Sequence, residues 1–336
     1  MKTRVAINGF GRIGRNAFKV AFERKDIEIV AINDLTDTKM LAHLLKYDSN
    51  YGNYPHDVSF DEKHVIVNDQ KIPVFAERDP AALPWGEHKV DIVIESTGFF
   101  VKSDAAKAHV TAGAKRVVIS APAKDDGAET IVLGANENDL EDSKAVVYSN
   151  ASCTTNSLAA IMDVMDREFG IKKAMMTTVH SYTADQRLQD APHKDYRRAR
   201  AAAQNIIPTS TGAAIAVAKT VPNLQGKFDG MAIRVPTSVV SISDVTMLLS
   251  RDTTKDEINE VIRKVCAEPY YQGILTCTDD ELVSSDFIGN SHSGIVDLPS
   301  TNVVDGDLAK IAVWYDNEWG YSNRLVELVA DIGKSL

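Results

Sequence analysis

The sequence has little cysteine. Its 336 residues include three, Cys153, Cys266 and Cys277, and no two of them form a CxxC pair. An odd number of widely spaced cysteines fits neither a disulfide framework nor a zinc cluster. We therefore expect a reducing, cytoplasmic location, no metal site and at least one free thiol.

The sequence also lacks a long apolar run and an excess of positive charge. No stretch of about 18 apolar residues is present, and 37 Lys and Arg face 47 Asp and Glu, for a net charge of -10. The first residues predict a strand and a turn rather than a signal peptide. Nucleic acid and anionic membranes require a basic face, so we expect neither as a partner.

Residues 1 to about 150 alternate short apolar runs with helical patterns. Strands are predicted at 4–8, 27–33, 90–97, 116–120, 130–134 and 145–150, helices at 12–24 and in "TKMLAHLLKY", and a hairpin in "HVIVN" and "KIPVF". Such apolar strands with helices between them are typical of a parallel sheet covered on both faces. The fold class expected for this part is α/β, of the Rossmann-type doubly wound kind.

The pattern changes after residue 152. A helix with an apolar face runs from there to Gly170, and long strands are predicted at 172–183 and 228–250. A helix at 254–267 opens with a capping-box pattern, and a last helix starts near 321. Longer strands and fewer βα alternations predict a second, α+β domain built on a mainly antiparallel sheet.

The stretch "GFGRIG" at 9–14 matches G-x-G-x-x-G in the required setting. It follows a strand, opens a helix and precedes Asp34 by twenty residues, at the end of the second strand. Gly9 allows the tight turn, Gly11 lets a pyrophosphate approach the backbone, and Gly14 lets helix and strand pack closely. Asp34 accepts hydrogen bonds from ribose hydroxyls and repels a 2′-phosphate, which favours NAD over NADP.

Cys153, in "NASCTTNS", lies among hydroxyls and amides at the start of a helix. Helix N-termini lower the pKa of a thiol, and a nearby imidazole lowers it further, so we expect Cys153 to be the most reactive thiol. His180, in the apolar strand "TTVHSYT", is its candidate partner. From these residues alone, a core histidine and a helix-start cysteine without a task remain alternatives.

Two further features suggest a small phosphorylated substrate. Arg234 lies within the apolar strand "GMAIRVPT", where a charge requires either a buried salt bridge or an anionic ligand. The stretch "TSTGAA" at 209–214 places hydroxyls and a glycine before a helix, an arrangement that suits phosphate.

Together "INGFGRIGR", "ASCTTN", "HSYT", "STGAA", "RVPT" and "WYDNEWGYS" make the sequence resemble the phosphorylating, NAD-dependent glyceraldehyde-3-phosphate dehydrogenases over essentially its whole length. The resemblance implies an NAD-binding domain at 1–151, joined by a C-terminal helix at 317–336, and a catalytic domain at 152–316. It implies oxidation of glyceraldehyde 3-phosphate to 1,3-bisphosphoglycerate, through a hemithioacetal and a thioester on the cysteine. It further implies a homotetramer, in which residues 181–205 line a neighbouring subunit's cofactor pocket.

The resemblance also assigns roles to residues. Cys153 would be the nucleophile, and His180 its activator, base and acid. The cofactor would be held by the glycine loop with Arg12 and Ile13, and by Asp34, Arg78, Ser120 and Asn317. Thr183 and Arg234 match one phosphate site, and the remaining phosphate-binding groups would be Ser152, Thr154, Arg198, Thr211 and Gly212. Pro192 matches the members that prefer NAD.

Three other functions fit parts of this pattern. An erythrose-4-phosphate dehydrogenase shares the cysteine chemistry but usually differs at "HSYT" and "STGAA". A Cys–His acyl hydrolase has no use for the dinucleotide fingerprint. A non-catalytic NAD-binding redox sensor would bind NAD through the same loop yet form no NADH from an aldehyde.

Overall fold

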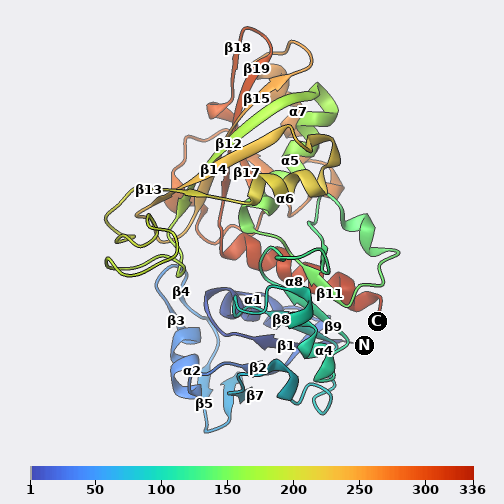
Figure 1. Cartoon of the computed structure of the whole chain (residues 1–336), viewed down its shortest axis with the longest axis vertical. Helices are drawn as coiled ribbons and strands as arrows, with labels where there is room; N and C mark the ends of the chain where they lie inside the picture. Colours follow the sequence, from blue (N-terminus) through green and yellow to red (C-terminus); the bar gives the residue numbers. More distant parts are fainter. Residues whose placement is uncertain (1) are drawn as a thin grey trace. The chain divides into compact units, whose positions relative to one another are not determined.

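A computed structural model describes residues 2–336, and contacts between the α-carbons divide the chain into two compact units (Figure 1). The first comprises Met1–Ile131, Asn138–Ala151 and Ser322–Leu336. The second comprises Val132–Glu137 and Ser152–Tyr321. Asn317 and the first turn of the last helix thus group with the second unit, whereas the sequence led us to expect them with the first.

The first unit is built on a nine-stranded sheet with the strand order β10-β11-β9-β8-β1-β2-β7-β6-β5. Its strands are β1 (Thr3–Asn8), β2 (Ile27–Asn33), β5 (Val58–Phe60), β6 (His64–Val67), β7 (Gln70–Phe75), β8 (Ile92–Glu95), β9 (Arg116–Ile119), β10 (Glu129–Thr130) and β11 (Val147–Ser149). All neighbours from β10 to β7 are parallel, and β7, β6 and β5 form the predicted antiparallel hairpin and its extension. A separate short pair joins β3 (Tyr47–Asp48) to β4 (Gly52–Asn53).

Helices connect the parallel strands, which confirms the doubly wound class. They are α1 (Arg12–Phe22), α2 (Thr38–Lys46), α3 (Ser103–Ala106) and α4 (Ala108–Thr111), followed at the end of the chain by α8 (Trp319–Lys334). The side chain of Asp37 caps α2 by accepting from the Met40 N–H at 2.9 Å, which satisfies one of the free donors at a helix start. Gly333 of α8 lies so close to Thr3 of β1 that a Cβ there would meet the Thr3 hydroxyl at 2.1 Å.

The second unit is built on an eight-stranded, mainly antiparallel sheet, as predicted. Its strands are β12 (Ile171–Ser181), β13 (Ile207–Ser210), β14 (Phe228–Val235), β15 (Ser241–Leu249), β16 (Leu275–Thr278), β17 (Gly294–Asp297), β18 (Asn302–Val304) and β19 (Leu308–Tyr315). Figure 1 shows β14, β12, β15 and β19 as neighbouring long strands, in the order β13-β14-β12-β15-β19-β17-β16. Only the β12–β14 and β16–β17 pairs are parallel.

Three longer helices belong to this unit: α5 (Cys153–Phe169), α6 (Ala213–Thr220) and α7 (Lys255–Cys266). Thr254 caps α7 by accepting from the Glu257 N–H at 3.2 Å. The Glu257 carboxylate accepts the Thr253 hydroxyl at 2.7 Å, so one half of the capping box is observed in the predicted form. Short 3₁₀ helices occupy Pro80–Ala82, Glu137–Leu140, Pro222–Leu224, Pro269–Tyr271, Ser284–Phe287 and Leu298–Ser300.

Several predicted strands were too long at their ends, and two differ from the structure for a specific physical reason. The run 130–134 is a strand only up to Thr130, because Val132 donates its N–H to the Asn136 side chain and leaves the sheet. The run 228–250 is two strands separated at residues 236–240. Val240 in this break has φ of 71°, a left-handed conformation that is a genuine outlier for a β-branched residue.

Candidate active site

The glycine loop connects β1 to α1 at the point where the strand order reverses. Gly9 has φ of 90°, and a Cβ on it would lie 2.7 Å from the Thr97 nitrogen. A Cβ on Gly14 would lie 2.1 Å from the Gly9 carbonyl oxygen. Both glycines are therefore required by the fold of the loop itself.

Gly11 differs from these two glycines. It precedes α1 with an ordinary φ of -73°, and a Cβ on it would meet no protein atom within 4 Å. Packing within the protein therefore does not require glycine at this position. An open backbone at a helix N-terminus is the surface that a pyrophosphate approaches.

Asp34 directly follows β2, beside the glycine loop. One of its carboxylate oxygens accepts the Phe10 N–H at 2.8 Å and the other accepts the Thr36 N–H at 3.0 Å. These bonds fix the carboxylate and leave further lone pairs on both oxygens. The glycine loop that Asp34 contacts lies at the boundary between β1 and β8. This boundary is the switch point of the parallel sheet, where this fold class binds dinucleotides.

The other predicted cofactor residues of the first unit lie after strand ends or on α1. Arg12, in the first turn of α1, forms an ion pair with Asp48 at 2.9 Å, and Ile13 beside it is half-buried. Arg78 lies exposed, three residues after β7. Ser120 follows β9 and donates its N–H to the Glu95 carbonyl. The open glycine backbone and the fixed Asp34 carboxylate fit an NAD molecule.

Cys153 is the first residue of α5, in the second unit. The side chain of Ser152 caps this helix by accepting the Thr155 N–H at 3.1 Å. The Cys153 sulfur lies 3.5 Å from Nε2 of His180, which comes from the end of β12. The structure therefore brings the two residues into the contact that the sequence alone left open.

Arg234 lies directly beside His180, because β12 and β14 are parallel and these two residues are in register. Its Nη1 is 2.7 Å from Nδ1 of His180 and donates to the Ser181 carbonyl at 2.9 Å. Its Nε is buried without a hydrogen-bond partner, and among the ion pairs of residues 2–336 no carboxylate pairs with it. A buried salt bridge is therefore not what holds this charge in the strand.

The imidazole of His180 has two neutral forms with different roles. Its Nδ1 lies 2.7 Å from the Ser181 carbonyl oxygen as well as 2.7 Å from Arg234. With the proton on Nδ1, the ring donates to this carbonyl and Nε2 can accept a proton from the thiol. With the proton on Nε2, Nδ1 accepts from Arg234 and Nε2 donates toward the sulfur.

Burial dominates the ionisation of both groups. It lowers the pKa of His180 to about 3, with the Arg234 charge as the second cause. Burial also raises the pKa of the Cys153 thiol, against the lowering effect of Arg234 and the helix N-terminus. This corrects the expectation of a low thiol pKa, because desolvation of the thiolate outweighs the favourable charges around it.

The predicted phosphate-binding residues lie in several places. Arg198 donates to the Thr209 hydroxyl at 3.0 Å and to the Ser210 carbonyl at 3.3 Å, just before Thr211 and Gly212. Its charge is already paired with Asp185 and contributes to lowering the pKa of His180. Gly212 caps α6, and a Cβ on it would meet no atom within 4 Å.

Thr154 and Thr183 are placed differently. The buried Thr154 hydroxyl is hydrogen-bonded to Tyr315 at 2.8 Å, and a hydrogen bond from the same side chain acts to lower the pKa of Cys153. Thr183 lies after β12, where its N–H donates to the Gln186 side chain at 3.4 Å.

Asn317 is buried, and its side-chain orientation is defined by two serines. Its Oδ1 accepts from the Ser181 hydroxyl at 2.9 Å and from the Ser241 hydroxyl at 3.2 Å. The Ser241 oxygen in turn accepts the Ser181 N–H at 3.1 Å. This network leaves the two N–H groups of the Asn317 amide as the donors available to a ligand.

The sequence did not identify three contributors to this arrangement. Tyr315 bonds both Thr154 and Thr178 at 2.8 Å and so ties α5 to β12. Ser181 and Ser241 orient Asn317. A tyrosine in a core strand and serines at strand ends are common, so no pattern distinguishes them before the strands are paired.

Residues 2–336 contain neither a membrane-spanning helix nor a cluster of metal-ligating side chains. No helix there combines the length and apolarity needed to cross a membrane. No group of three or more His, Cys, Asp or Glu side chains is arranged to hold a metal ion.

Comparison with known proteins matches both parts of the chain to family models. Residues 3–103 match "Glyceraldehyde 3-phosphate dehydrogenase, NAD binding domain", and residues 152–317 match the C-terminal domain of the same family. Glyceraldehyde-3-phosphate dehydrogenase 1 of Bacillus subtilis is 54% identical over 335 residues, which cover 99% of each chain. The Geobacillus stearothermophilus protein of that name is 53% identical over 332 residues, covering 99% of this chain and 98% of the relative.

Proposed function

Because the chain belongs to the glyceraldehyde-3-phosphate dehydrogenase family, we propose that Cys153, His180 and Arg234 form the catalytic centre of an NAD-dependent, phosphorylating aldehyde dehydrogenase. The enzyme oxidises glyceraldehyde 3-phosphate with NAD and inorganic phosphate to 1,3-bisphosphoglycerate. The observation that carries the assignment of residues is the 3.5 Å contact between the Cys153 sulfur and Nε2 of His180 at the start of α5.

The first step is addition of the thiol to the aldehyde. The Cys153 sulfur bonds to the carbonyl carbon while His180 Nε2 takes the thiol proton, and His180 then returns this proton to the carbonyl oxygen, which completes the hemithioacetal and leaves the ring neutral. The free N–H groups at the start of α5 favour negative charge on that oxygen. Burial keeps His180 neutral near pH 7, so the ring enters the reaction as a base.

The second step is oxidation of the hemithioacetal to a thioester. NAD supplies the hydride acceptor for this step when it is bound. His180 removes the hydroxyl proton. The Asn317 amide, held by Ser181 and Ser241, would offer its N–H donors to the carboxamide oxygen of the nicotinamide. Inorganic phosphate then attacks the thioester carbon and releases Cys153 as the leaving group, which His180 reprotonates.

We assign the two phosphates to sites that each contain one arginine, Arg234 at the first and Arg198 at the second. Arg234 is half-buried, its buried Nε has no hydrogen-bond partner, and a phosphate bound to it would compensate its charge. Thr183 would join it at that position. We assign the second phosphate to Ser152, Thr154, Arg198, Thr211 and Gly212, with the α6 N-terminus as its anion-binding element. At Thr154 the backbone rather than the hydroxyl would take part.

The cofactor is NAD, and we assign its contacts to the glycine loop with Arg12 and Ile13, and to Asp34, Arg78, Ser120 and Asn317. The Asp34 carboxylate would accept both adenosine-ribose hydroxyls with the lone pairs that Phe10 and Thr36 leave free. A 2′-phosphate at this position would meet like-charge repulsion.

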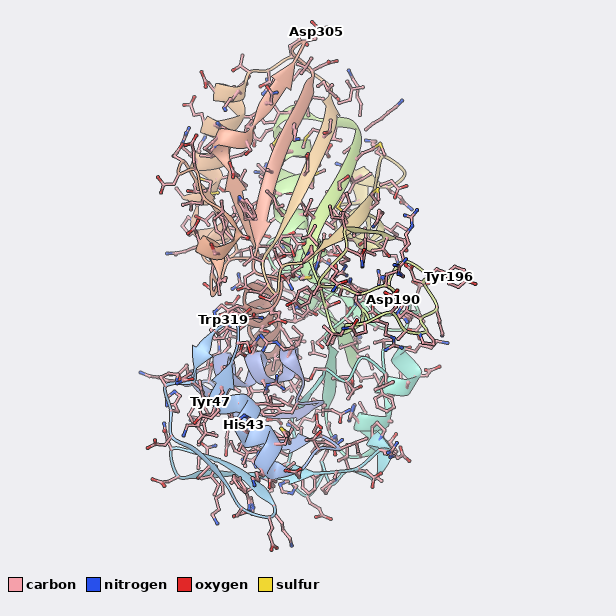
Figure 2. The ribbon with its side chains drawn as sticks, turned by 90° about the vertical axis from the view of Figure 1, so that its left-hand side faces the viewer. His43, Tyr47, Asp190, Tyr196, Asp305 and Trp319 are labelled. Atoms are coloured by element: carbon pink, nitrogen blue, oxygen red, sulfur yellow. The ribbon has the colours of Figure 1, made fainter. Side chains whose placement is uncertain are left out.

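A homotetramer is the assembly we propose. One face of the second unit's sheet exposes apolar side chains, including Met175 at 69% and Met231 at 39%, which is typical of a protein interface. The loop at 181–205 supports the same assembly: Figure 2 shows Asp190 and Tyr196 on it, and Tyr196 is 88% exposed. We further propose a cytoplasmic location, which three free thiols favour.

The assay of choice follows NADH absorbance with glyceraldehyde 3-phosphate and NAD, with and without phosphate. We expect sustained turnover that requires phosphate, nearly complete loss in Cys153→Ser, and a decrease of roughly 10²–10⁴-fold in His180→Asn. Erythrose 4-phosphate as the better substrate would favour the related dehydrogenase. NAD binding without NADH formation from either aldehyde would favour a redox sensor.

A further inference from the structure

Cys266 and Cys277 lie outside the catalytic centre, yet the fold brings them together. Cys266 is the last residue of α7, and Cys277 lies in β16, an edge strand that pairs only with β17. Both are free and partly exposed. The ten residues between them contain a 3₁₀ turn at Pro269–Tyr271.

An ion pair next to the thiols supports this placement independently. Arg263 Nη2 bonds to Asp279 Oδ1 at 2.5 Å, and its Nε approaches Oδ2 at 3.4 Å. Cys266 follows Arg263 by three residues on the same helix face, and Cys277 in β16 precedes Asp279, the first residue after that strand, by two residues. The Arg263–Asp279 salt bridge therefore joins α7 to the end of β16, the two elements that contain the cysteines.

The two thiols are chemically unequal. A side-chain hydrogen bond from Cys266 holds the pKa of Cys277 at about 7, and the Arg263 charge acts in the same direction against burial and Asp279. The same hydrogen bond, together with burial, raises the pKa of Cys266. Cys277 is thus the more readily ionised of the two thiols, and Cys266 is the thiol that donates to it.

We propose that Cys266 and Cys277 form a reversible dithiol–disulfide site, which reacts with low-molecular-weight disulfides. The Cys277 thiolate attacks one sulfur of the external disulfide, forming a mixed disulfide and expelling one thiolate. Cys266 then loses its proton to solvent and attacks the Cys277 sulfur. The Cys266–Cys277 bond forms, and the second external thiolate leaves.

Electrons balance in this exchange, since the protein dithiol loses two electrons and the external disulfide becomes two thiols. Bond formation brings the sulfurs to about 2 Å. That movement is favoured because Cys266 is the last residue of its helix and Cys277 lies in a strand at the edge of the sheet, so regular structure holds each residue on one side. The site is separate from the catalytic thiol, for it uses neither Cys153 nor His180.

The test treats the full-length protein with oxidised glutathione at neutral pH, followed by alkylation and mass spectrometry of the peptides. In the unmodified protein we expect a linked pair of peptides containing Cys266 and Cys277, with the mass of two hydrogens lost and no glutathione retained there. Dithiothreitol should reverse the link. The Cys153 peptide is quantified separately, so its own reaction does not confuse the result.

Two variants assign the order of attack. Cys266→Ser should stop at a stable glutathione adduct on Cys277, and Cys277→Ser should slow modification of Cys266 by at least about 10-fold. Glutathione adducts on both cysteines of the unmodified protein, without a linked product, would overturn the proposal.

A reagent that needs no variant gives a second test. Phenylarsine oxide bridges two neighbouring thiols, so one equivalent should protect Cys266 and Cys277 together from alkylation. Independent alkylation of the two cysteines after this treatment would show that they do not act as a pair.

Discussion

Replacing Arg234 with Gln should raise the pKa of His180. Two unit charges about 4 Å apart at an effective dielectric constant of about 20 interact with about 4 kcal/mol. Partial solvent access reduces this to roughly 2–3 kcal/mol, and one pH unit corresponds to about 1.4 kcal/mol. The pKa of His180 should therefore rise from about 3 to roughly 5. Burial, the larger cause, is unchanged, so the pKa stays below 6.5.

The assay is an NMR titration of the histidine Cε1 protons, with the His180 signal assigned from its absence in His180→Asn. The matched control is Arg197→Gln, which removes the same charge from an exposed side chain that donates to the Pro208 carbonyl. Arg197→Gln should leave the midpoint of the His180 titration unchanged. An equal titration midpoint in Arg234→Gln and the unmodified protein would refute the electrostatic reasoning.

Folding stability offers an independent reading of the same pKa. The unfolded chain protonates His180 near pH 6.5 and the folded chain near 3, so unfolding takes up a proton between these values. The stability that depends on a neutral His180 is therefore complete above pH 6.5 and is lost as the pH falls from about 6.5 to about 3. In Arg234→Gln the window is narrower, and urea titrations should show a smaller loss of stability on acidification.

Three further predictions concern the other thiols and the cofactor site. In the ligand-free protein, iodoacetamide at pH 7 should modify Cys277 before Cys153, as read from peptide masses, because burial raises the pKa of Cys153, whereas the hydrogen bond from Cys266 outweighs burial at Cys277 and lowers its pKa; faster labelling of Cys153 would contradict this. Gly11→Ala should leave the thermal midpoint nearly unchanged but weaken NAD binding in calorimetry, whereas Gly14→Ala should lower the midpoint, since its Cβ would lie 2.1 Å from a carbonyl oxygen; equal midpoints would refute the distinction. kcat/KM should favour NAD over NADP by at least about 10²-fold, or about 2.7 kcal/mol, and Asp34→Ala should narrow that gap in steady-state assays; equal use of both cofactors by the unmodified protein would overturn the role of Asp34.

Much of the fold could be predicted because its signals are local. The apolar strands, the helix α2 and the glycine loop each depend on a few neighbouring residues. The run 130–134 failed because an apolar run of this length does not specify a strand when a side chain, here Asn136, offers the backbone another partner. The break at 236–240 depends on a strained Val240 that no local pattern indicates.

The candidate site was predictable in its parts rather than in its arrangement. Cys153 at a helix start and Arg234 in an apolar strand are visible in the sequence. Arg234 meets His180 through the β12–β14 register, and Cys153 meets it because α5 packs beside β12; both are non-local properties. The raised pKa of Cys153 was missed for the same reason, because desolvation is set by what folds around the thiol.

The most direct test of the central assignment is a single-turnover experiment without phosphate. Protein, NAD and glyceraldehyde 3-phosphate are mixed rapidly, NADH is followed by absorbance, and the acid-quenched protein is mapped by mass spectrometry. We predict a burst of at most one NADH per chain, an acyl group on the Cys153 peptide and its release when phosphate is added. Continuous NADH formation without phosphate, or an acyl group on Cys266 or Cys277 instead, would contradict the assignment of Cys153 as the nucleophile.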